Sequence, residues 1–97
     1  MKTFKDLVFT MVSAGMKQAI MRFPNGYGVS VLRGAGALSD PSHPYEIAVI
    51  MFKNDGGFTV IYPEFCDGDV LSFKTESEVN RYMWLTQELA PESVEAP

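Results

Sequence analysis

The stretch Tyr45-Glu-Ile-Ala-Val-Ile-Met-Phe52 decides the fold of this chain, because every residue after Glu46 is apolar. An uninterrupted apolar run of this length, rich in β-branched residues, predicts a strand that is buried on both faces. The backbone groups of a buried strand must be paired along both edges. We therefore expect residues 45–52 to lie at the centre of a β-sheet.

The chain that follows this strand turns back on itself. Asn54-Asp-Gly-Gly57 predicts a tight reversal, and residues 58–62 predict the returning strand. Pro63 ends that strand, because proline has no N–H to donate to a ladder. Residues 70–73 then predict a short edge strand.

The chain that precedes the central strand predicts a hairpin. Residues 17–23 and 27–33 read as strands joined by Pro24-Asn-Gly26, in which proline fixes φ and Asn-Gly tolerates positive φ. Residues 34–44 contain small residues and two prolines, which predict an irregular loop. A loop of this length in so small a domain either carries function or is simply mobile.

A helix is predicted at the amino-terminal end. Five apolar residues recur at the spacing of one helix face: Phe4, Leu7, Val8, Met11 and Val12. This pattern predicts a helix over residues 3–14. Gly15 would end it, because glycine adopts the left-handed conformation at helix ends.

A second helix is predicted near the carboxyl end. Thr75-Glu-Ser-Glu78 matches the capping box, in which Thr75 and Glu78 satisfy two free N–H groups. One face of this helix would hold Val79, Tyr82, Met83, Thr86, Leu89 and Ala90. Pro91 would stop the helix, and residues 91–97 would form a flexible acidic tail.

These elements predict an α+β fold in the order α-β-β-β-β-(β)-α. The expected architecture is a single antiparallel sheet of four to five strands, with an amino-terminal and a carboxyl-terminal helix on one face. A chain of 97 residues fits one domain, which we place at residues 1–90. The apolar share of 46% is that of a globular protein, and no run is long enough to span a membrane.

The charge is divided unevenly along the chain, although the formal net charge is only −4. Residues 1–36 hold five cations and one acid, whereas residues 37–97 hold three cations and eleven acids. Five well-spaced cations do not make the dense basic stripe of a nucleic-acid binder, so direct nucleic-acid binding is not expected. The acidic half is either an ordinary solvated face or a contact for a basic protein surface.

The residues available for catalysis are few. The single cysteine, Cys66, excludes a disulfide framework and suits a reducing cytoplasm, where we expect the protein to reside. Ser39, Asp40 and His43 are the residue types of a hydrolase triad. The residues of a triad converge in space on a rigid scaffold, however, and these three are neighbours in one proline-flanked loop. Gly26-Tyr-Gly28 and Gly34-Ala-Gly36 do not complete a phosphate-binding motif. We expect the protein to have no enzymatic activity and to bind no cofactor; catalysis through His43 or Cys66 is the weaker alternative.

An acidic turn follows the returning strand, with Glu64, Asp67 and Asp69 close together. Oxygen ligands at this spacing could hold a hard cation weakly, but the twelve-residue calcium-loop pattern is absent. A solvated turn is the preferred interpretation, and no metal site is predicted. The three carboxylates remain candidate contacts for a partner.

The most informative surface candidate is Trp84. In the final helix it lies roughly 140° from Val79, since each residue advances the helix by about 100°. If the Val79 face meets the sheet, Trp84 points towards solvent and forms a partner-binding patch with Arg81 and Glu88. The alternative is that Trp84 packs against the other helix or under the tail.

A sequence motif resembles a known group of proteins. The chain reads FPNGYGVSVLRG at residues 23–34 and YEIAV at residues 45–49. This resembles a family of small uncharacterised proteins of bacteriophages and prophages, with the pattern F-P-N-G-Y-G-x-S-V-x-R-G followed by Y-E-x-A-V. Asp69-Val70 and residues 75–79 stand where the family has an aspartate-valine step and a Glu-rich helix. The match covers roughly residues 21–83, so the amino-terminal segment lies outside it.

The resemblance implies a phage accessory protein in the host cytoplasm. The expected function is to bind and inhibit or redirect a host protein or protein–nucleic-acid complex; a defence factor of the CRISPR or restriction type is one such target. The alternative is a structural or self-assembling phage protein, such as a homodimer joined through sheet edges or Trp84. Within the motif, Arg33 either pairs with Glu46 across the sheet or binds a partner.

Overall fold

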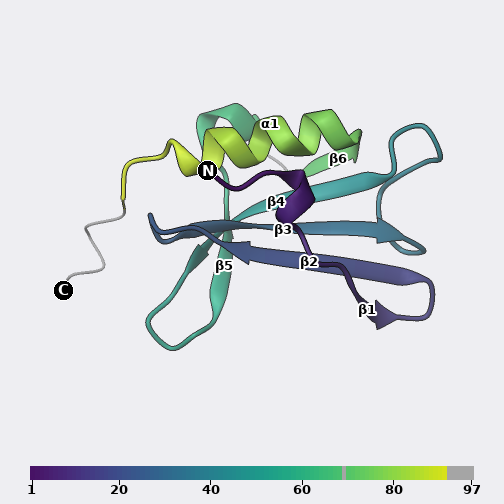
Figure 1. Cartoon of the computed structure of the whole chain (residues 1–97), viewed down its shortest axis with the longest axis horizontal. Helices are drawn as coiled ribbons and strands as arrows, with labels where there is room; N and C mark the ends of the chain where they lie inside the picture. The colour runs from purple at the N-terminus through teal and green to yellow at the C-terminus, as the bar shows by residue number, and fades with distance from the viewer. Residues whose placement is uncertain (69, 92–97) are drawn as a thin grey trace.

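The computed structural model describes residues 1–68 and 70–91, and it has an α+β fold with one open antiparallel sheet and one α-helix (Figure 1). Its elements in chain order are η1 Phe4–Asp6, β1 Thr10–Ser13, β2 Met16–Arg22, β3 Tyr27–Gly34, β4 Tyr45–Phe52, β5 Phe58–Ile61, η2 Glu64–Cys66, β6 Leu71–Lys74 and α1 Glu76–Gln87. None of the helices in the described ranges is long and apolar enough to cross a membrane.

Strand β4 is the centre of the sheet, as its apolar sequence predicts. The strands are ordered β1-β2-β3-β4-β5, and each pairs antiparallel with its neighbour. The edge of β4 away from β3 is shared: β5 pairs with its second half and β6 with its first half. Both edges of β4 are therefore hydrogen-bonded, and the strand holds the six-stranded sheet together.

The core lies between one face of the sheet and α1. Val29 and Val31 of β3 stand directly opposite Val49 and Ile47 of β4, and all four side chains are at most 1% exposed. Val79 and Met83 of α1 are also fully buried and belong to the same cluster. Burying an aliphatic side chain of this size contributes roughly 1.5–3 kcal/mol, so these pairs dominate the stability of the fold.

The predicted helix over residues 3–14 is wrong. Only the single 3-10 turn η1 forms there, and the chain then runs into strand β1, which pairs with β2 from Thr10 onward. Val8, Phe9, Thr10 and Val12 are β-branched or aromatic and fit a pleated strand better than a helix. Gly15, at φ 77°, serves the turn between β1 and β2 instead of ending a helix. The sheet consequently gains a strand, and one α-helix covers it instead of two.

The loop over residues 34–44 is tied to the sheet by its own backbone. The Leu38 N–H donates to Glu46 Oε1 over 3.0 Å, and the Leu38 carbonyl accepts from the Phe73 N–H at 2.9 Å. Asp40 and His43 exchange two backbone hydrogen bonds. The predicted tail over residues 91–97 falls outside the described ranges except for Pro91.

The approach of Gly34 to Gly15 gives a test of the unexpected β1–β2 hairpin. Gly34 has φ 94°, and an added Cβ would meet the Gly15 carbonyl oxygen; Gly56 has φ 89° but open space around it. We expect Gly56→Ala to cost about 1–2 kcal/mol from the positive φ alone. Gly34→Ala should cost at least about 1 kcal/mol more, because the clash adds to that strain. Urea unfolding curves measure both, and equal losses would contradict the hairpin.

Candidate partner-binding surface

Helix α1 begins at the capping box that the sequence predicts. The Glu78 N–H donates to Thr75 Oγ1 over 3.3 Å, and the Thr75 N–H donates to Glu78 Oε1 over 2.9 Å. That backbone hydrogen bond holds the pKa of the Glu78 carboxyl below its usual value. The first turn of the helix is thus fixed by its own sequence.

The far end of α1 is held by the turn between β2 and β3. Asn25 Nδ2 donates to the carbonyl oxygens of Thr86 at 2.9 Å and Leu89 at 3.1 Å, and its Oδ1 accepts from the Tyr27 N–H. The last carbonyls of a helix have no partner within it, so this asparagine acts as a cap supplied from the sheet. Nothing in the local spacing of the turn indicates that role.

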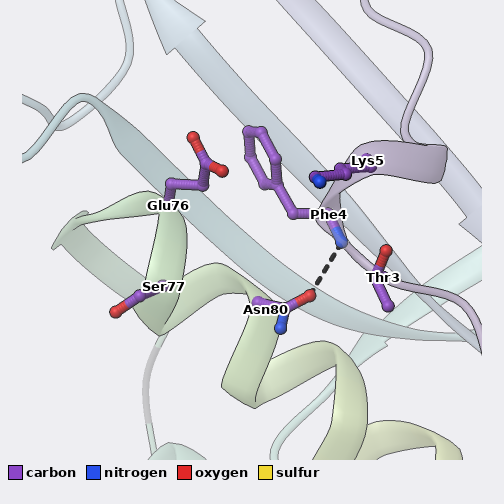
Figure 2. A pocket seen from close by; sticks show the side chains of 6 residues that line it. All are labelled: Thr3, Phe4, Lys5, Glu76, Ser77 and Asn80. Atoms are coloured by element: carbon purple, nitrogen blue, oxygen red, sulfur yellow. Dashed lines mark hydrogen bonds between the residues drawn. The ribbon is translucent and has the colours of Figure 1, made fainter.

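The amino-terminal segment is fastened along α1 by side-chain amides. The Phe4 N–H donates to Asn80 Oδ1 over 2.8 Å, the bond drawn in Figure 2. About two turns further along α1, the Gln87 side chain accepts a hydrogen bond from the Lys2 N–H and donates one to the Lys2 carbonyl, both at 2.8 Å. These contacts set the segment beside the helix without covering its outer face.

The outer face of α1 carries the exposed residues Ser77, Arg81, Trp84 and Glu88. The opposite face is buried through Val79, Met83 and Thr86. Trp84 is 51% exposed, which confirms its predicted direction towards solvent. Packing of Trp84 against an amino-terminal helix is wrong, because residues 3–14 form no α-helix; the other alternative, packing under the tail, falls outside the described residues except for Pro91. We call Arg81, Trp84 and Glu88 the Trp84 patch.

A hollow of about 470 Å³ lies beside the amino-terminal end of this stripe (Figure 2). It is formed between the amino-terminal segment and the first turns of α1, with Phe4, Lys5, Glu76 and Ser77 around it. Ser77 belongs both to the hollow and to the exposed stripe. A partner side chain seated in the hollow would therefore lie next to the Trp84 patch.

The acidic turn sits next to α1. Phe65 of η2 stacks on Tyr82 of α1 with ring centroids 6.2 Å apart. Glu64 and Asp67 are exposed on this turn, whereas Asp69 lies outside the described residues. Across residues 1–68 and 70–91, no three His, Cys, Asp or Glu side chains are placed to hold a metal ion.

The two residues of the weaker, catalytic alternative are in different surroundings. Cys66 is buried in the core, and burial raises the pKa of its thiol, which disfavours the reactive thiolate. His43 is exposed, and its Nδ1 lies 3.1 Å from Asp40 Oδ1. The His43 N–H also donates to Asp40 and lowers the pKa of that carboxyl. The arrangement is that of a loop closed on an aspartate side chain.

The predicted pairing of Arg33 with Glu46 is wrong. Arg33 stands opposite Tyr45 and Glu46 stands opposite Leu32, so Arg33 and Glu46 point to opposite faces of the sheet. The Arg33 guanidinium instead lies over the rings of Phe9 at 6.0 Å and Tyr45 at 5.9 Å. In this position Arg33 helps to hold the amino-terminal segment on the sheet.

The chain matches no protein-family model, no curated protein and no solved structure. Its function is therefore inferred from the exposed surface described above and from the motif at residues 23–49.

The depressed pKa of Glu78 predicts a pH dependence of stability. A carboxyl whose pKa is lower in the folded than in the unfolded state adds stability at neutral pH, and this is lost as the pH falls through its folded pKa. We expect Glu78→Gln to lose less unfolding free energy than wild type between about pH 6 and pH 3. Thermal melts across this range measure the slope. Glu88→Gln removes a carboxylate from the same helix without touching the cap, and the same change of slope in both variants would contradict the assignment.

Proposed function

We propose that the protein is a non-enzymatic, phage-encoded accessory protein that binds a host protein or protein–nucleic-acid complex and inhibits or redirects it. The observation that carries the proposal is Trp84, a half-exposed tryptophan in the middle of the solvent face of α1. Tryptophan and arginine are the residues that contribute most to protein interfaces, and Arg81 lies one turn from Trp84. The phage origin rests on the resemblance of the motif at residues 23–49.

Exposed carboxylates on and near α1 are the basis for proposing a basic partner. Glu88 lies one turn after Trp84, and Glu64 and Asp67 are exposed on the turn that packs against α1 through Phe65. Surface carboxylates can contact a basic groove that normally binds nucleic acid. A host nuclease of the CRISPR or restriction type has such a groove, and we place it first among the candidate targets.

The Trp84 patch is tested by capture from host lysate followed by measurement of affinity for the captured protein. We expect Trp84→Ala to weaken the affinity by about 30-fold or more, the effect of losing an interface anchor of about 2 kcal/mol. Met11→Ala removes an exposed apolar side chain from β1 and should leave the affinity unchanged. Unchanged affinity in Trp84→Ala, with both variants folded by circular dichroism, would contradict the proposal.

The alternative function is self-assembly without a host target, and strand β1 favours it. All four residues of this edge strand are exposed, with Met11 at 67% and Val12 at 50%. An edge strand leaves one row of backbone N–H and C=O groups without a neighbouring strand, and such an edge pairs readily with another chain. The partner in this case is a second copy, whose β1 would extend the sheet.

Sedimentation equilibrium distinguishes self-assembly from host binding. If β1 joins two copies, wild type is a dimer at micromolar concentration, and Met11→Lys shifts it to monomer because charges on an edge strand oppose pairing. Ile20→Lys places the same charge on the neighbouring strand β2 and should leave the dimer intact. A strictly monomeric wild type would rule this function out.

A further inference from the structure

A second pocket lies at the end of the sheet that carries the β2–β3 and β4–β5 turns. It has a volume of about 430 Å³ and is bounded by the ends of β2 and β4, by the turn at residues 24–26 and by Pro91 after α1. It shares no lining residue with the Trp84 patch or with the hollow beside it. Its ligand therefore has to be inferred from its own side chains.

Arg22 is held at the rim of this pocket by an aromatic ring. Its guanidinium carbon lies 5.0 Å from the centroid of the Phe52 ring. The Phe52 ring is itself fixed, because Phe58 packs edge-on to it at 5.8 Å and Gly28 leaves it room. A Cβ on Gly28 would approach a Phe52 ring carbon to 2.7 Å. A guanidinium laid over a ring keeps its N–H edge available for a planar pair of oxygen acceptors.

Among the described residues that line the pocket, the charged side chains are both cations. Arg22 and Lys53 line it, and no carboxylate does so. Within residues 1–68 and 70–91 the only ion pair joins His43 to Asp40, so neither cation has an acidic partner there. Asp55 of the nearby turn uses its carboxylate to accept the Gly57 N–H at 2.8 Å. Two unpaired cations beside one pocket, in a chain of net charge −4, favour an anionic ligand.

We propose that this pocket binds a small organic phosphate. Arg22 would donate hydrogen bonds from its N–H edge to two phosphate oxygens. Lys53 would supply the second positive charge, so that the two cations balance the charge of a phosphate monoester. The volume exceeds what inorganic phosphate needs, and Met51, Phe52 and Pro91 offer apolar surface for the rest of the molecule. Asn54 adds a side-chain amide at the rim. This binding of an organic phosphate is separate from the protein-binding function proposed above.

The test is an amide NMR titration of the full chain with phenyl phosphate in phosphate-free buffer. We expect saturable shifts confined to residues 22–28 and 51–54. Inorganic phosphate should bind about tenfold more weakly, because it leaves the apolar wall uncovered, and phenol should not bind. Arg22→Gln and Lys53→Gln should each weaken binding of phenyl phosphate by about tenfold or more.

Lys17→Gln is the matched control, because Lys17 is an exposed cation on the same strand as Arg22 but on the other face of the sheet. Its affinity for phenyl phosphate should equal that of wild type. Equal weakening in all three variants, shifts spread over every cation, or equal affinity for inorganic and phenyl phosphate would each overturn the proposal. Lys53 lies just after β4 and is exposed, so Lys53→Gln decides the matter if Arg22→Gln does not fold.

Discussion

The structure depends on how one helix covers one face of a sheet that is wider than the helix. A helix with its side chains is about 10 Å across and neighbouring strands are about 4.8 Å apart, so α1 can cover about two strands. It contacts β3 and β4, where the fully buried valines and isoleucine lie. The remaining width is filled by irregular segments: Phe4, Leu7 and Phe9 from the amino-terminal end, and Phe65 from η2. Docking of Val79 and Met83 on the sheet therefore sets the space that these irregular segments fill.

The strands and turns that could be predicted are those whose signals are local. The apolar run of β4 and the turns at residues 24–26 and 54–57 each contain enough information to place a strand or a reversal. The amino-terminal segment does not, because residues 4–12 hold six apolar side chains. Five of them satisfy a helical period, whereas Leu7, Phe9 and Met11 alternate as in a strand. Two contacts decide between them: the short-range pairing of β1 with β2, and the edge-on packing of Phe4 on Tyr45, which lies far along the chain.

The candidate surfaces divide in the same way. The direction of Trp84 follows from its angle to Val79 within one helix, so periodicity alone predicts it. The faces of Arg33 and Glu46 depend on register, and residues in neighbouring positions of paired strands point in opposite directions. The phosphate pocket was not predicted, because Arg22, Lys53 and Pro91 are far apart in the chain. One signal was present: in a run of hairpins, alternate turns lie at the same end of the sheet, so the β2–β3 and β4–β5 turns bring residues 22 and 53 together.

The motif at residues 23–34 mainly builds the scaffold. Phe23 is buried in the core, Asn25 caps the far end of α1, Gly28 admits the Phe52 ring, and Arg33 lies over Phe9 and Tyr45. Each of these four positions makes an internal contact that supports the scaffold, although Arg33 is also exposed and Asn25 also lines the pocket beside Arg22. The three side chains on which the two proposals rest, Trp84, Arg22 and Lys53, lie outside this segment. A chain that shares the motif is therefore expected to share the scaffold, whereas its partner would be set by the outer face of α1 and by the two positions at the end of the sheet.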